Sequence, residues 1–117
     1  MINQLSMAEL ASEYWKLLQA FDRSVVLVPD SARARLGAQA RYSSERLTIL
    51  MERAGLRIIS FDGLKFEVNL PAIAVNAEDI PSGQTCVVER TLEPAVVAGA
   101  SVIVTGKVFV VESKSEG

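Results

Sequence analysis

Residues 52–68, ERAGLRIISFDGLKFEV, contain the point at which the pattern of the chain changes from helix to strand. Gly55 follows the helical pattern, and a glycine can take the left-handed conformation that ends a helix. Leu56 can then pack back on Met51, as a Schellman cap requires. The segments LRIIS and LKFEV flank an Asp-Gly turn at 61–63, and this arrangement predicts a β-hairpin.

Two helices are predicted before this point, separated by a break at Pro29. The first runs over about 6–27, because Ser6 can cap it and Glu9 completes a capping box. The second, which Asp30 or Ser31 can cap, runs to Ala54 and contains apolar residues at helical spacing.

The apolar face of the helices is wider than the seam of a two-stranded coiled coil. Two helices of this length cannot bury such faces against each other alone. A second copy that donates two more helices would complete a four-helix bundle. The residues predicted to form this dimer interface are Leu10, Tyr14, Leu17, Phe21, Leu36, Leu47 and Leu50.

Strand patterns fill the second half of the chain. The segments TCVVERTL, AVVA, SVIVT and KVFVVE are short and separated by proline or glycine, which is typical of a small, mostly antiparallel sheet or barrel. KVFVVE, residues 107–112, is apolar on both faces, which favours a central strand or one covered by a partner. We therefore predict an α+β protein, with a helical dimerisation hairpin over 1–55 and a partner-binding β-domain over 56–117.

Composition narrows the class of protein. Half of the 117 residues are hydrophobic and the formal net charge is -2, which indicates a folded chain and does not favour a general nucleic-acid binder. No apolar run approaches the length of a membrane span, and the first residues lack the basic region of a secretory signal. The single cysteine, Cys86, fits a reducing cytoplasm.

Few residues suggest catalysis. The chain has no histidine, so the commonest general base and transition-metal ligand are absent. Cys86 lies in a predicted strand, where a core role is favoured over a nucleophilic one. Glu78 and Asp79 are adjacent in a polar loop, where solvated carboxylates are favoured over an acid–base pair. We expect no catalytic residue, no metal and no cofactor, and hence no enzyme.

Two further features have alternative interpretations. The second helix region carries six arginines, and a basic helix can follow a phosphate backbone. A solvated surface with some ion pairs is the favoured interpretation. Trp15 lies beside the apolar stripe of the first helix, where packing is favoured over stacking on a ligand. These arginines are Arg33, Arg35, Arg41, Arg46, Arg53 and Arg57.

The order of elements resembles the GrpE family, the nucleotide-exchange factors of DnaK-type chaperones. ELASEYWKLLQAFDRS (9–24) and the segment over 29–59 are similar to the two bundle helices of that family. FDGLKFEVNLPAIAV (61–75) resembles the start of its β-domain, and VERTLEPAVVAGASVIVTGKVFVVE (88–112) resembles its closing stretch.

The closing stretch matches the spacing of a Val-Ile/Leu-Arg-Pro-Ala-x-Val-x-Val signature and also departs from it. The two arginines of the signature fall on Ser101 and Val104. The family's His-Glu is replaced at 71–73, its Gly-Tyr falls within 93–96, and its long N-terminal helix has no counterpart. Loss of the arginines removes charge-assisted contacts, so the fold can persist while exchange is weakened.

The resemblance implies a homodimeric co-chaperone that binds the ATPase domain of a DnaK-type chaperone and promotes ADP release. A dimeric adaptor without exchange activity is the alternative, and nucleic-acid binding through the arginine-bearing helix ranks third. Neither nucleic acid nor a membrane is the expected partner. The β-domain residues predicted to bind the partner are Phe66, Asn69, Leu70, Val102, Val104 and Lys107.

Overall fold

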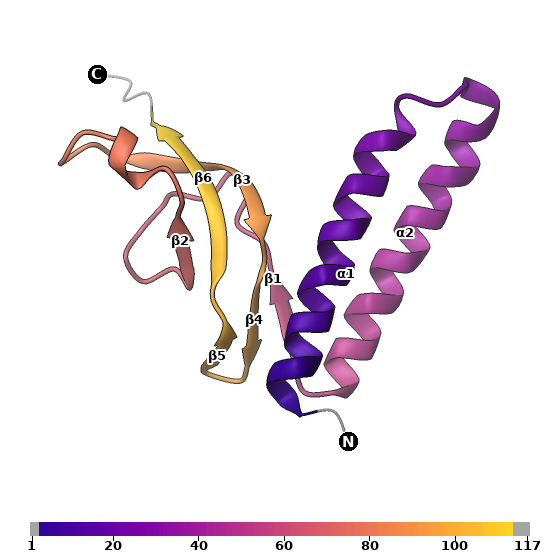
Figure 1. Cartoon of the computed structure of the whole chain (residues 1–117), viewed down its shortest axis with the longest axis horizontal. Coiled ribbons are helices and arrows are strands. Elements are labelled where there is room, and N and C mark those ends of the chain that lie inside the picture. The colour runs from indigo at the N-terminus through magenta and orange to yellow at the C-terminus, as the bar shows by residue number, and fades with distance from the viewer. Residues whose placement is uncertain (1–2, 114–117) are drawn as a thin grey trace.

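The computed structural model describes residues 3–113 and has the expected α+β order. Helices α1 (Gln4–Val25) and α2 (Asp30–Arg53) form an antiparallel hairpin, and a lobe of short strands follows it (Figure 1). The lobe contains β1 (Arg57–Ile59), β2 (Ala72–Ala74), the short 3₁₀ helix η1 (Ala77–Asp79), β3 (Cys86–Glu93), β4 (Ala95–Ala98), β5 (Ser101–Val104) and β6 (Gly106–Glu112).

The first helix begins earlier than its sequence suggests. Asn3, rather than Ser6, is the N-cap, because its Oδ1 accepts a hydrogen bond from the Ser6 N–H at 2.7 Å. Asparagine caps a helix about as well as serine. The helix therefore starts earlier than predicted and still has a capped N-terminus. The second helix begins at Asp30, so the cap predicted at Asp30 or Ser31 is wrong: Pro29 is the N-cap, and no side chain caps this end.

The cap that ends α2 is confirmed. Gly55 has a φ of 75°, in the left-handed region that favours glycine. The Leu56 N–H donates to the Met51 carbonyl at 2.9 Å, and the Gly55 N–H donates to the Glu52 carbonyl at 3.0 Å. These are the two hydrogen bonds of a Schellman motif. Leu56 and Met51 also pack in one buried cluster, so the cap fixes the direction in which the chain enters the lobe.

The hairpin predicted around the Asp-Gly turn is wrong. The turn forms, since the Leu64 N–H donates to the Phe61 carbonyl at 3.0 Å, but its two arms pair with different strands. β1 lies antiparallel to β4, whereas the Gly63 N–H donates to the Val88 carbonyl on β3 and the Leu64 carbonyl accepts from the Val88 N–H. Only Gly63 of the two central residues has a positive φ. The tight hairpin turn with two such residues is therefore not available, and the arms diverge.

Thr91 on β3 fixes this turn in place. Its Oγ1 accepts from the Phe61 N–H at 2.8 Å, and its own N–H donates to Asp62 Oδ1 at 2.7 Å. The buried Phe61 ring is thereby held in the core of the lobe. Two side-chain hydrogen bonds thus replace the strand pairing that the sequence suggested.

The strands form two three-stranded sheets, in the orders β1-β4-β5 and β2-β6-β3. All pairings are antiparallel except that of β2 with β6, which is parallel. β6 is the central strand of its sheet, as its sequence predicts. The chain passes from one sheet to the other at the buried Pro94 and Gly106, so β3-β4 and β5-β6 form one long hairpin with a corner.

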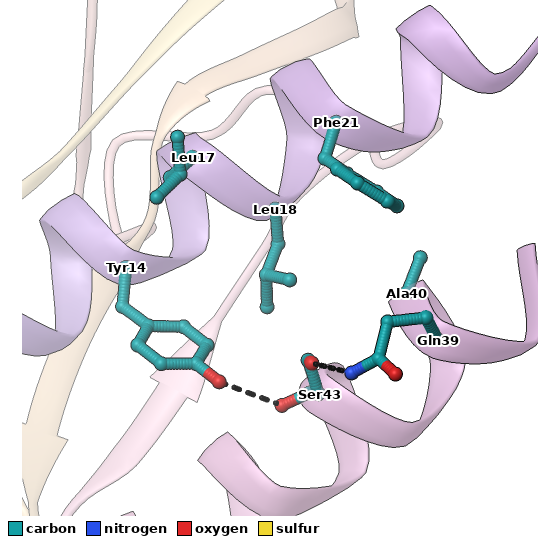
Figure 2. A pocket seen from close by; sticks show the side chains of 7 residues that line it. All are labelled: Tyr14, Leu17, Leu18, Phe21, Gln39, Ala40 and Ser43. Carbon is teal, nitrogen blue, oxygen red and sulfur yellow. Dashed lines mark hydrogen bonds between the residues drawn. The ribbon is translucent and has the colours of Figure 1, made fainter. Parts of the chain in front are cut away.

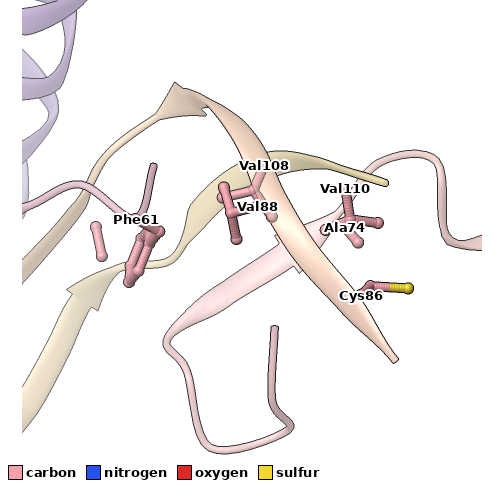
Figure 3. Packing of buried hydrophobic residues seen from close by; sticks show 7 residues of the cluster. Phe61, Ala74, Cys86, Val88, Val108 and Val110 are labelled. Atoms are coloured by element: carbon pink, nitrogen blue, oxygen red, sulfur yellow. The ribbon is translucent and has the colours of Figure 1, made fainter. Parts of the chain in front are cut away.

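Each sheet has its own core. The sheet β2-β6-β3 buries Phe61, Val88, Val108 and Val110 beneath the loops that precede β3 (Figure 3). The sheet β1-β4-β5 packs against the base of the helical hairpin, where the small residues of α1 allow close approach. The hairpin and the lobe meet along the lower half of α1 in Figure 1 and diverge toward the top of the view.

Replacing Gly106 with alanine tests the corner. A Cβ at this position would lie 2.9 Å from Phe61 Cε2 and 3.0 Å from the Ala95 nitrogen and the Glu93 oxygen. We expect Gly106→Ala to lower the free energy of unfolding by about 1–3 kcal/mol, as overpacking does. Urea denaturation measures this change. The control is Gly37→Ala in α2, where the nearest atom would lie at 3.8 Å and helix propensity favours alanine by up to about 1 kcal/mol. An unchanged urea midpoint for Gly106→Ala would contradict the packing of the corner.

Candidate functional site

The hairpin presents an apolar face on the side away from the lobe. Leu17 is 71% exposed and Leu10 is 62% exposed, and Tyr14 and Phe21 continue the same stripe along α1. Tyr14, Leu17 and Phe21 also line a groove of about 250 Å³ between the two helices (Figure 2). The Tyr14 hydroxyl lies 3.5 Å from the Ser43 carbonyl across this groove.

Helix α2 contributes less to this face than expected. Leu50 is exposed and Leu36 is half-buried, so both remain accessible. Leu47 is only 5% exposed and lies in the core between the hairpin and the sheet β1-β4-β5. Leu47 therefore supports the hairpin from within, while the other residues of the predicted interface reach its surface.

The predicted partner-binding residues of the lobe do not share one surface. Phe66 and Leu70 are half-buried and pack against the core of β2-β6-β3. Val104 packs against the other core, next to the hairpin. Of the remaining residues, Asn69, Val102 and Lys107 are exposed, but they lie on different elements.

A more continuous surface lies on the outer face of β2-β6-β3, and sequence reasoning missed it. Ile73 and Val75 are 58% and 52% exposed, and Phe109 on the central strand is 38% exposed. Lys107 is the one predicted residue on this face, opposite Ile73. The signal was present in β6, where Val108 and Val110 are buried and their neighbours alternate outward. We call Ile73, Val75, Lys107 and Phe109 the outer sheet face.

A three-residue ion cluster joins the hairpin to the lobe. Lys16 Nζ on α1 lies 3.0 Å from Glu93 Oε1 on β3, and Lys107 Nζ on β6 lies 3.5 Å from Glu93 Oε2. Lys16 also pairs with Glu13 one turn before it. Glu93 is thus the only acidic group between two cations of different elements within residues 3–113.

These contacts shift the pKa values of two groups. Hydrogen bonds to Glu13 and then to Glu93 raise the pKa of Lys16 above its usual 10.5. The hydrogen bond from Lys16 lowers the pKa of the Glu93 carboxyl below 4.5, against the opposing effect of partial burial. Each charge therefore stabilises the other, and the attraction acts across the boundary between α1 and the lobe.

The remaining candidates for chemistry are dispersed. Cys86 is buried in the core of β2-β6-β3, as a small core residue would be. Glu78 and Asp79 are exposed within the short helix η1. Trp15 is half-buried and packs against the core beneath the hairpin. Within residues 3–113 no three histidine, cysteine or acidic side chains gather closely enough to hold a metal ion.

The arginines of the α2 region are also dispersed. Arg33 forms an ion pair with Asp30 at 2.9 Å and donates to two carbonyls at the tip of the hairpin. Arg35, Arg41 and Arg53 are exposed. This dispersed arrangement fits a solvated surface better than a single basic strip that would bind a phosphate backbone.

Comparisons with known proteins give no relative. No protein-family model, no curated protein and no solved structure matches the chain. Within the described residues, neither helix combines the length and the apolar character needed to cross a membrane.

The pH dependence of stability tests the ion cluster. The lowered pKa of Glu93 stabilises the folded protein above a pH of about 4.5, and this contribution is lost as the pH falls through the folded pKa. The raised pKa of Lys16 adds stability that is present below 10.5 and lost as the pH rises through its folded pKa. We expect Glu93→Gln to cost about 0.5–1 kcal/mol near neutral pH. Thermal unfolding measures the cost, which should vanish when the carboxyl is protonated at low pH. A cost that stays the same in acid would contradict the role of charge.

Proposed function

We propose that this chain is a homodimeric, non-catalytic co-chaperone of GrpE-like architecture, which binds the ATPase domain of a DnaK-type chaperone and promotes ADP release. One observation supports a binding protein above all. The chain has two separate exposed apolar faces, one on the hairpin and one on the lobe. Large exposed apolar surfaces mark sites of association. The choice of chaperone as the partner rests on the GrpE resemblance.

The hairpin face suits a second copy. Glu13 lies three residues after Leu10 and four before Leu17, so it borders the apolar stripe of α1. Arg46 lies three residues after Ser43 and four before Leu50, so it borders the groove on α2. The face therefore has Glu13, which also pairs with Lys16, at one edge and Arg46 at the other. Placing α1 of one copy over α2 of the other brings opposite charges together, whereas α1 over α1 opposes like charges.

The outer sheet face then remains for the chaperone. It is carried by the central strand β6 and the short strand β2, so its apolar side chains stand on a rigid platform. Exchange requires no catalytic group on this chain. A protein that binds the open form of a nucleotide cleft more tightly than the closed form shifts the population toward the open form, and ADP leaves faster.

A dimeric adaptor without exchange activity is the second candidate, and one observation favours it. The lobe packs against α1 and is held there by the Lys16–Glu93 ion pair, instead of projecting freely from the bundle. The arginines of the GrpE signature are also replaced, by Ser101 and Val104. A lobe held against α1 in this way can bind a partner on its exposed side, but it cannot extend around that partner.

The mass in solution tests the dimer. Light scattering should give twice the 12.7 kDa of one chain at micromolar concentration. Because Leu17 is largely exposed in one copy, Leu17→Glu should place a charge in the interface and yield a monomer with unchanged helical circular dichroism. Val68→Glu, at a fully exposed position of the lobe, is the control and should remain a dimer. A wild-type chain with the mass of a monomer would refute the proposed interface.

Nucleotide release tests the chaperone role. Stopped-flow release of a fluorescent ADP analogue from the cognate DnaK-type chaperone should accelerate when this protein is added. Ile73→Asp, on the outer sheet face, should weaken binding by about tenfold or more, which corresponds to about 1.4 kcal/mol. Leu27→Asp, an exposed position at the tip of the hairpin, should behave as wild type.

The outcomes separate the two candidates. Binding to the chaperone without faster release would select the adaptor. An unchanged release rate at saturating protein would refute the exchange role. Equal effects of Ile73→Asp and Leu27→Asp would show that the outer sheet face is not the docking surface.

A further inference from the structure

A polar cleft lies at the junction of the hairpin and the lobe. It has a volume of about 140 Å³ and lies between α1 and β3, where these two elements begin to diverge (Figure 1). Trp15, Lys16, Gln19 and Arg23 line it from α1, and Arg90 lines it from β3. None of the residues that define the two apolar faces lines the cleft, and it adjoins the outer sheet face where Arg90 lies opposite Phe109.

The cleft has an excess of positive charge. Three cations line it, and Lys16 already has Glu13 and Glu93 as ion-pair partners. Within residues 3–113 neither Arg23 nor Arg90 forms an ion pair. This excess occurs in a chain whose formal net charge is -2. Two exposed arginines that form no ion pair among the described residues therefore line one small cleft.

Folding explains only part of this arrangement. Arg23 lies in the last turn of α1, where a cation interacts favourably with the helix dipole. Arg90 lies opposite Phe109 at an exposed sheet position, where its stem can pack on the ring, but this contact leaves its charge without a counter-ion. Like charges that line one cavity repel each other, so an anion between them would offset a cost that the folded chain otherwise bears.

We propose that this cleft binds a phosphate group, with Arg23 and Arg90 as its principal ligands. Guanidinium groups present paired donors that match the oxygens of phosphate. Gln19 supplies a further amide donor, and the Trp15 ring forms the apolar wall. A cleft of this size is smaller than the roughly 300–1,000 Å³ of a pocket that encloses a whole ligand. It therefore holds one phosphate group, and the rest of a larger ligand lies outside.

The only tryptophan of the chain lines the cleft and reports binding directly. Titration with inorganic phosphate should change the emission of Trp15 along a saturable curve. Arg90→Gln and Arg23→Gln should each raise the dissociation constant about tenfold or more. Arg41→Gln, which removes an exposed arginine outside this cleft, is the matched control and should leave it unchanged. Circular dichroism of each variant establishes that the fold is retained.

A second arm identifies the source of the phosphate. Tighter binding of a capped phosphoserine peptide than of inorganic phosphate would assign the site to phosphorylated protein, and equal binding would assign it to free phosphate. Either result supports the proposal. It is overturned if sodium chloride at matched ionic strength gives the same curve, if phosphate gives no saturable change, or if Arg41→Gln weakens binding as much as Arg90→Gln. None of these outcomes depends on the chaperone partner.

Discussion

Helix α1 has neighbours on several sides, and the architecture depends on how its surface is divided among them. Ala8, Ala11 and Ser12 are buried at the base of the hairpin, and small side chains there let the helix approach the lobe closely. Leu18 packs in the same core. The opposite side carries Leu10 and the rest of the exposed stripe. A bulky residue on the small side would separate the two halves, because a packed interior tolerates little added volume.

The lobe meets α1 through one bent hairpin rather than through two independent sheets. β3-β4 and β5-β6 both turn at the corner formed by Pro94 and Gly106, and Glu93 stands immediately before that corner. The ion pair with Lys16 therefore acts where the two sheets join. Any displacement of the lobe relative to the helix would strain the corner and the ion pair together. The corner and the ion pair therefore both favour the arrangement in which the two apolar faces are observed.

The sequence predicts the periodic and locally capped parts of this fold best. The α2 boundaries, the glycine cap and the central position of β6 were predicted because each depends on neighbouring residues. The pairing of β1 with β4 was not predicted, because the two strands are far apart in the sequence and Thr91 on β3, also far along the chain, holds the turn that follows β1. The outer sheet face was missed for the same reason, since Ile73 and Phe109 become neighbours only when β2 aligns with β6.

The small-residue side of α1 has a consequence for biosynthesis. The helical hairpin is complete at Arg53, whereas β4 and β5, which cover the small-residue side of α1, begin only at Ala95. At a translation rate of roughly 5–20 residues per second, the nascent hairpin stays uncovered on both sides for a period on the order of seconds. During that time, the hairpin of another chain that is being translated from the same mRNA can pack against the exposed apolar stripe of α1. Pairing between chains can thus precede completion of either lobe.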